Sequence, residues 1–327
     1  MTKGYETAPT PRQYAEQVLA HSEVVLDDAR DIAFPEAPDL DPIQAFPKPT
    51  EVRSESPDIP ELTDDRKEAL LAKASELGFG RPENVTLSEQ GLFDATVILE
   101  GGQPHKMLAE ARMVVDDEDA KPKAIILSAS PHRKLSNAAE IASAERLFGH
   151  AGETEYDVAL DVVRALPGFS ELAEPQVINA SYDIENNFAT SQEPSGQFKT
   201  VGHIGNTPVV LMQINRHNFV NEQGQSKYDK QPGTATVIGI VDAVTKASGD
   251  NSSPLVHVTS GTYRPSRTLG AAIAGLTAER SVGIATYGNN LLNEIKGDNA
   301  PAPVEQLPGE LHEMAVQAAK LREALNN

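Results

Sequence analysis

The chain has 327 residues and no cysteine, and 48 acidic residues against 28 basic ones give it a formal net charge of −20. The lack of cysteine excludes disulfides, thiol nucleophiles, iron–sulfur clusters and cysteine-ligated zinc. Because the chain is strongly acidic, we expect neither nucleic acid nor a membrane surface as a partner. It begins without an apolar leader and has no run of about 18 apolar residues, so we expect a cytoplasmic protein.

Residues 1–62 predict a helix followed by an acidic, proline-rich extension. Thr10-Pro11 is typical of a helix cap and a first-turn proline, and the apolar spacing beyond them predicts a helix to Arg30. The prolines between residues 34 and 60 disfavour regular helix and central strand, so an extended linker is expected. This linker would either wrap the main domain or join the helix to a neighbouring subunit. Its apolar residues are Phe34, Leu40, Ile43 and Phe46.

Residues 63–305 predict a Rossmann-like α/β domain. Thr63 is expected to cap a helix that ends at Gly78. Beyond it, uniformly apolar runs alternate with helical stretches, which predicts a doubly wound, mostly parallel sheet of strands buried on both sides, with helices on both faces. The expected strands are Ala95–Leu99, Ala124–Leu127, Val177–Ile178, Val209–Ile214, Leu255–Val258 and Val282–Ala285. The expected helices are Pro104–Val115, Asn137–Phe148, Thr154–Leu166, Thr234–Ala247 and Pro265–Leu276.

Two further segments complete the chain. Ser181–Phe198 is rich in Asn, Ser, Gln and Gly without a clear period, which predicts a loop or a short hairpin. Residues 306–327 predict an amphipathic helix, Leu307–Leu325. That helix would either cap the sheet or make the chain a homo-oligomer.

Open α/β sheets bind ligands at the carboxyl ends of their strands, so we looked for chemistry there. Gly101 and Gly102 follow the first strand and open a helix, where the backbone can approach a ligand and the helix N-terminus favours an anion. A plain tight turn explains the glycine pair equally well. Neither the dinucleotide-binding nor the Walker glycine pattern occurs, so no particular cofactor is indicated.

Polar residues also follow the other strands. Ser130 and Arg216 stand at two strand ends, and the most informative segment runs from Val256 to Arg267. Its residues Thr259, Ser260 and Arg267 could bind an anionic ligand while Tyr263 stacks or donates a hydrogen bond. His257, inside an apolar run, is expected to be a satisfied core histidine. The histidines lack zinc-site spacing, so no metal is expected.

Two acids open one of the expected helices. Glu153 and Asp157 lie near Thr154, where acids ordinarily serve as electrostatic caps. If that turn faces the cleft, they could instead act as a general base or bind a divalent ion. They are therefore the candidate catalytic residues.

The order of these strand ends resembles the SanA/YdcF-like family of bacterial Rossmann-like proteins, from about Asp94 to Tyr287. Gly101-Gly102 matches the family's first glycine cluster but is one glycine short, and Thr234 matches one residue of an asparagine-threonine pair. The stretch from Val258 to Arg267 matches the late strand end, with Tyr263 where many members carry histidine. The resemblance implies a nucleotide-like ligand, such as S-adenosylmethionine, but no histidine-dependent chemistry.

Three hypotheses follow for the function. The leading one is a domain that binds a small anionic or nucleotide-like molecule at the carboxyl ends of its strands, acting on it as a transferase or hydrolase if it is an enzyme. Its rival is a non-catalytic structural or assembly protein that uses its N-terminal arm and C-terminal helix for subunit contacts. The third is a magnesium-dependent phosphohydrolase using Glu100, Glu153 and Asp157.

Overall fold

The computed structural model describes fourteen stretches of the chain. They are residues 10–37, 39–46, 63–76, 83–100, 103–131, 133–135, 138–180, 196–214, 218–220, 226–228, 234–250, 252–259, 265–297 and 307–327. Their contacts divide the chain into two compact units. Unit 1 comprises Met1–Arg81, Thr262–Val282 and Ala300–Asn327, and unit 2 comprises Pro82–Gly261 and Gly283–Asn299.

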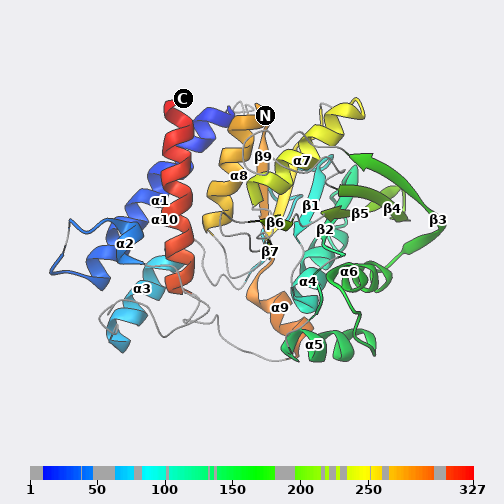
Figure 1. The fold of residues 1–327 in the computed structure, drawn as a ribbon, viewed down its shortest axis with the longest axis horizontal. Helices are drawn as coiled ribbons and strands as arrows, with labels where there is room; N and C mark the ends of the chain where they lie inside the picture. Colours follow the sequence, from blue (N-terminus) through cyan, green and yellow to red (C-terminus); the bar gives the residue numbers. More distant parts are fainter. Residues whose placement is uncertain are drawn as a thin grey trace, which may run out of the picture. The chain divides into compact units, whose positions relative to one another are not determined.

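The described part of unit 1 is helical, and its helices come from distant parts of the chain (Figure 1). They are α1 (Pro11–Ala33), α2 (Pro42–Ala45), α3 (Asp64–Glu76), α8 (Pro265–Ala278) and α10 (Leu307–Asn326). Thr10 and Gln13 form a reciprocal capping box at the start of α1, as the Thr10-Pro11 pattern predicts. The sequence-based boundaries at residues 62 and 305 differ from this division, because α8 packs against both α1 and α10.

Helix α10 is amphipathic as expected, and its apolar stripe is buried within unit 1. Leu311, Met314 and Leu321 are buried in a core to which α1 and α8 also contribute. Glu310 of α10 accepts hydrogen bonds from Ser266 N (3.0 Å) and Oγ (2.6 Å), which caps the first turn of α8. The apolar stripe of α10, which suggested a subunit contact, is therefore packed against other helices of the same chain.

The proline-rich linker contains one short helix, so the expectation of an extended chain is wrong for Pro42–Ala45. Proline costs nothing at the first position of a helix, where its missing N–H would have no intrahelical partner, and Asp41 caps this turn through Ile43 N at 2.8 Å. Phe34 and Phe46 are buried with ring centroids 6.3 Å apart. This part of the linker packs on the core of unit 1, and residues 47–62 lie outside the described residues.

Unit 2 contains a seven-stranded, mostly parallel sheet in the order β3-β4-β5-β2-β1-β8-β9, which confirms the predicted α/β fold with its doubly wound sheet (Figure 1). The β1–β2, β1–β8 and β2–β5 pairs are parallel, whereas β3–β4 and β4–β5 are antiparallel. The strands are β1 (Thr96–Glu100), β2 (Ala124–Ala129), β3 (Phe169–Ala180), β4 (Gly196–Ile204), β5 (Thr207–Ile214), β8 (Leu255–Thr259) and β9 (Val282–Thr286). The helices of unit 2 are α4 (Pro104–Val115), α5 (Ala138–Phe148), α6 (Glu155–Arg164), α7 (Thr234–Ala247) and α9 (Asn289–Lys296). A separate two-stranded sheet pairs β6 (Asn218–Val220) with β7 (Ser226–Tyr228).

One predicted strand is not buried on both faces. Val177 and Ile178 are 49% and 54% exposed, because β3 is the outermost strand of an antiparallel hairpin at the sheet edge. The loop expected at Ser181–Phe198 ends in strand β4 from Gly196, and residues 181–195 lie outside the described residues. Helix α9 was not expected.

The two faces of the parallel strands differ in chemistry. On one face, Val97, Leu127 and Val258 join a core with residues of α4 and α6, and α4 packs on β1 while α6 packs on β2. Helix α7 packs on β8, and its buried residues are not part of that core, so α7 covers the other side. We call these sides the α4 face and the α7 face. None of the described helices is both long and apolar enough to cross a bilayer.

Candidate functional site

The sheet reverses its direction of winding between β1 and β8. From β1 the chain passes through α4 to β2 on one side, whereas β8 and then β9 lie on the other side of β1. In open α/β sheets the helices that leave two such strands diverge to opposite faces, which opens a crevice outside their carboxyl ends. The candidate site is therefore centred on the carboxyl ends of β1 and β8.

Buried polar side chains lie only on the α7 face of the described strands β1, β2, β8 and β9. Successive strand residues point to opposite faces, and the register pairs Leu99 with both Leu127 and Val258 on the α4 face. Ser128, His257 and Thr259 therefore share the α7 face. Thr286 lies there too, because its neighbours Ala285 and Tyr287 belong to the core of the α4 face.

Three hydroxyls on the α7 face stand at the carboxyl ends of their strands; we call Ser128, Thr259 and Thr286 the hydroxyl cluster. Thr259 is fully buried, and its Oγ1 has no hydrogen-bond partner among the described residues. Ser128 and Thr286 are 9% and 7% exposed, and no described residue forms a hydrogen bond with either hydroxyl. A fully buried polar group without a partner costs roughly 1–3 kcal/mol, so the Thr259 hydroxyl is unusual unless something else occupies its surroundings.

The cluster has a defined spacing. Tyr287 N donates to Thr259 O at 3.3 Å, which sets the ends of β8 and β9 level and places Thr286 beside Thr259. Neighbouring strands are about 4.8 Å apart. Ser128 is separated from Thr259 by β1, so those two residues stand roughly two strand spacings apart, about 9.6 Å.

The loop after β2 is fixed to the start of α6 by a buried carboxylate. Glu155, only 2% exposed, accepts a hydrogen bond from Ser130 N at 3.0 Å and pairs with Arg133 Nη1 at 3.4 Å. Arg133 Nη2 also pairs with buried Glu140 at 2.6 Å. The Arg133 charge is thus compensated within the protein.

Both candidate catalytic acids belong to the turn that opens α6. Asp157 Oδ2 accepts from Thr154 N and Oγ1, each at 2.8 Å, and Thr154 Oγ1 accepts from Asp157 N in a reciprocal capping box. Glu153 is exposed, and its carbonyl accepts from Leu135 N at 3.1 Å. A Cβ added at Gly152 would lie 2.6 Å from Asp157 Cβ, so this turn requires glycine.

Other groups of this region serve packing. Tyr156, in the first turn of α6, lies under Lys199, whose Nζ is 5.4 Å from the ring centroid. Burial raises the pKa of Tyr156, and the nearby Asp157 raises it further. His105 Nδ1 lies 3.2 Å from Ser143 Oγ, which ties the start of α4 to α5. His257 is fully buried in β8, where a core histidine was expected.

The sequence-predicted ligand residues are only partly brought together. Ser130 follows β2 and Thr259 ends β8, two strands that β1 separates, and Thr234 begins α7. Arg267 is half-buried in the first turn of α8, which belongs to unit 1. Gly101, Gly102, Arg216, Ser260 and Tyr263 lie outside the described residues.

Of the hydroxyl cluster, Thr286 was missed by sequence reasoning, and Ser128 was not chosen over Ser130 at the end of the same strand. The available signal was strand alternation: each hydroxyl stands an even number of residues from another α7-face residue of its own strand, Ile126 and Val282 respectively. Among the described residues, no group of three or more acidic or histidine side chains is placed to hold a metal ion.

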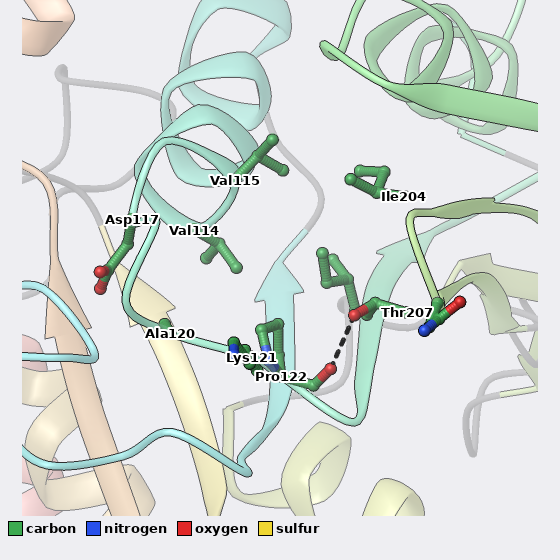
Figure 2. A pocket seen from close by; sticks show the side chains of 10 residues that line it. Val114, Val115, Asp117, Ala120, Lys121, Pro122, Ile204 and Thr207 are labelled. Atoms are coloured by element: carbon green, nitrogen blue, oxygen red, sulfur yellow. Dashed lines mark hydrogen bonds between the residues drawn. The ribbon is translucent and has the colours of Figure 1, made fainter.

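A pocket of about 300 Å³ lies at the opposite, amino-terminal edge of the sheet (Figure 2). Val114, Ile125 and Ile204 contribute to its apolar wall. Two of its polar groups are used internally, because Thr207 Oγ1 donates to Pro122 O at 2.9 Å and Asp117 Oδ2 accepts from Ser88 N at 2.9 Å. We therefore regard this pocket as a packing gap and not as the functional site.

No protein-family model, curated protein or solved structure matches the chain.

Proposed function

We propose that unit 2 binds a small anionic ligand, of which a nucleotide is one example, in the crevice outside the carboxyl ends of β1 and β8. The observation that carries this proposal is the reversal of winding at the β1–β8 boundary. The polar ends of β2, β8 and β9 support it, because a purely structural sheet has no need of buried hydroxyls there.

Catalysis on that ligand, by a transferase or hydrolase reaction, is a further part of the proposal, as is a cytoplasmic location. Glu153 and Asp157 are the acids nearest in sequence to the Glu155 anchor of the β2 loop, so they remain the candidates for a general base. The capping role of Asp157 makes Glu153, whose side chain is exposed, the better candidate. The resemblance to the SanA/YdcF-like family stays a prediction.

The first experiment is a thermal-shift screen of the purified chain against nucleotides, S-adenosylmethionine, sugar phosphates and divalent ions. A ligand at a hundred times its Kd stabilises the folded state by about 2.7 kcal/mol. A dose-dependent rise in melting temperature with at least one anionic compound is expected. A flat response across the panel would overturn the proposal.

Two matched variants then locate the site. Thr259→Val and Thr96→Val make the same change on the same face of neighbouring strands, but Thr96 stands at the amino end, where its Oγ1 lies 3.3 Å from Ser253 Oγ. We expect Thr259→Val to weaken binding of the hit and Thr96→Val to leave its Kd unchanged. If Thr96→Val were the more damaging, the ligand would bind at the wrong edge for this proposal.

A further inference from the structure

Two helix N-termini, one on each face of the sheet, are candidates to bind an anion where the direction of winding reverses between β1 and β8. Helix α4 follows β1, and its N-cap residue Gln103 forms no side-chain cap hydrogen bond. Helix α7 precedes β8: the chain leaves α7 at Ala247 and enters β8 at its amino end, Leu255. Helix α7 must therefore run antiparallel to β8, with Thr234 toward the carboxyl end of that strand.

The lengths of the two elements agree with this placement. The 14 residues of α7 span about 21 Å at 1.5 Å per residue. The 5 residues of β8 span about 16 Å. Helix α7 is therefore long enough for its N-terminus to reach the level of Thr259, where its partial positive charge would favour an anion on the α7 face.

The hydroxyl cluster distinguishes the two helix N-termini. On the α4 face, the residues that β1, β2 and β8 contribute near this edge are Leu99, Ala129 and Val258, which are apolar and offer an anion no hydrogen bond from a side chain. The α7 face offers Thr259, whose buried Oγ1 has no hydrogen-bond partner in the described part of the chain, and Thr286, which is 7% exposed and whose hydroxyl forms no hydrogen bond with a described residue. Hydroxyl donors beside a helix N-terminus are the groups that bind phosphate oxygens in proteins.

We propose that Thr259 and Thr286, with the N-terminus of α7, form the seat of a phosphate group on the α7 face of the sheet. This inference rests on the proposed function and names the group that the site binds. Their strands are about 4.8 Å apart, a distance that two hydroxyls can bridge through different oxygens of one phosphate. Ser128, about 9.6 Å from Thr259, is too far to share that phosphate and contacts the remainder of a larger ligand.

The test uses inorganic phosphate as the probe and isothermal titration calorimetry of the full chain. We expect Thr259→Val and Thr286→Val each to weaken phosphate binding roughly tenfold or more, because a hydrogen bond to a charged group contributes about 1.5–3 kcal/mol. Ser128→Ala and Thr96→Val are the matched controls, and both should keep the wild-type Kd for phosphate. Circular dichroism and melting temperatures establish that each variant folds.

A second probe pair extends the test to a larger ligand. Adenosine 5′-monophosphate and adenosine differ only in the phosphate, so the ratio of their affinities measures what the phosphate contributes. That ratio should fall toward one in Thr259→Val and stay at the wild-type value in Ser128→Ala. Equal losses for both compounds in Thr259→Val would show that the hydroxyls hold the nucleoside and would overturn the proposed seat.

The outcomes separate the two proposals. If phosphate binds the wild type but neither threonine variant weakens it, the seat is wrong while the proposed function stands. If only S-adenosylmethionine or a divalent cation stabilises the chain, neither of which carries a phosphate or a net negative charge, the phosphate assignment and the proposed anion binding are both wrong. If nothing in either experiment binds, both proposals fail.

Discussion

The α4 face and the α7 face are made by alternate residues of the same strands, yet their buried side chains differ in polarity. The α4 face is apolar along β1, β2 and β8 and shares one core with α4 and α6. The α7 face is equally buried but carries hydroxyls and an imidazole toward the carboxyl edge. The difference teaches that burial alone does not identify a packing surface: one face provides stability, whereas the other gives up some stability to retain polar groups.

The largest effect should come from opening a cavity on the α4 face. Leu127 is 1% exposed, and Leu127→Ala should lower the free energy of unfolding by roughly 2–5 kcal/mol. The neighbouring Ser128→Ala, on the α7 face of the same strand, should change it by less than about 1 kcal/mol. Urea denaturation of both variants measures the contrast, and equal losses would show that the faces do not differ as described.

A smaller loss should follow from removing the anchor between the β2 loop and α6. Glu155→Gln keeps the size of the side chain but leaves Arg133 with one charged partner, Glu140, and weakens the bond to Ser130 N. We expect a loss of about 1–3 kcal/mol in the free energy of unfolding, together with weaker ligand binding. Exposed Glu153→Gln is the matched control and should leave stability unchanged. A Glu155 variant of wild-type stability would mean that this buried carboxylate anchors nothing.

A substitution in the hydroxyl cluster is expected to raise the free energy of unfolding and not to lower it. Thr259→Val replaces a buried hydroxyl without a partner by a methyl group of similar size, so the ligand-free chain should become about 1 kcal/mol more stable. Thr96→Val removes a hydroxyl that lies within hydrogen-bond distance of Ser253 and should not stabilise the chain. Thermal melts without ligand measure both. Destabilisation by Thr259→Val would indicate that its hydroxyl is already satisfied.

The smallest expected effect is a pH-dependent change in stability that involves Asp161 of α6, the helix that packs on the α4 face. Burial raises the pKa of Asp161 in α6, although His150 and Arg164 oppose the rise. A raised folded-state pKa favours the protonated acid, so its contribution to stability is present below the unfolded pKa and is lost as pH rises through the folded value. Asp161→Asn should therefore gain a fraction of a kcal/mol at pH 7, and the gain should disappear toward pH 3. A gain independent of pH would contradict this assignment.

Much of the fold could be predicted because local signals agree with tertiary packing. The bounds of α4 and α7 match those expected, since Pro104 marks one helix start and apolar periodicity marks the other. The exposure of Val177 and Ile178 could not be predicted, because the edge of a sheet is set by strand order and not by composition. Nor does the sequence reveal that α8, between two strands of unit 2, packs with α1 and α10.

The candidate site was predictable only where it follows directly from a strand end. Thr259 and Ser130 were named because each closes an apolar run. The face of the sheet on which Ser128 and Thr286 stand could be assigned only from the structure, through the register of β1 with β2 and through the core to which Ala285 and Tyr287 belong.

The packing of α10 against α1 also has a consequence for how the chain is made. Arg12 Nη2 donates to Leu325 O at 2.7 Å, and Arg322 pairs with Glu23 at 2.6 Å, so helices separated by almost the whole sequence are neighbours. A ribosome produces α1 long before α8 and α10, and every strand of the sheet emerges before α10 does. During most of translation, α1 therefore has only α2 and α3 of its neighbours available, and unit 1 completes its core with α8 and α10 after unit 2 although its synthesis begins first.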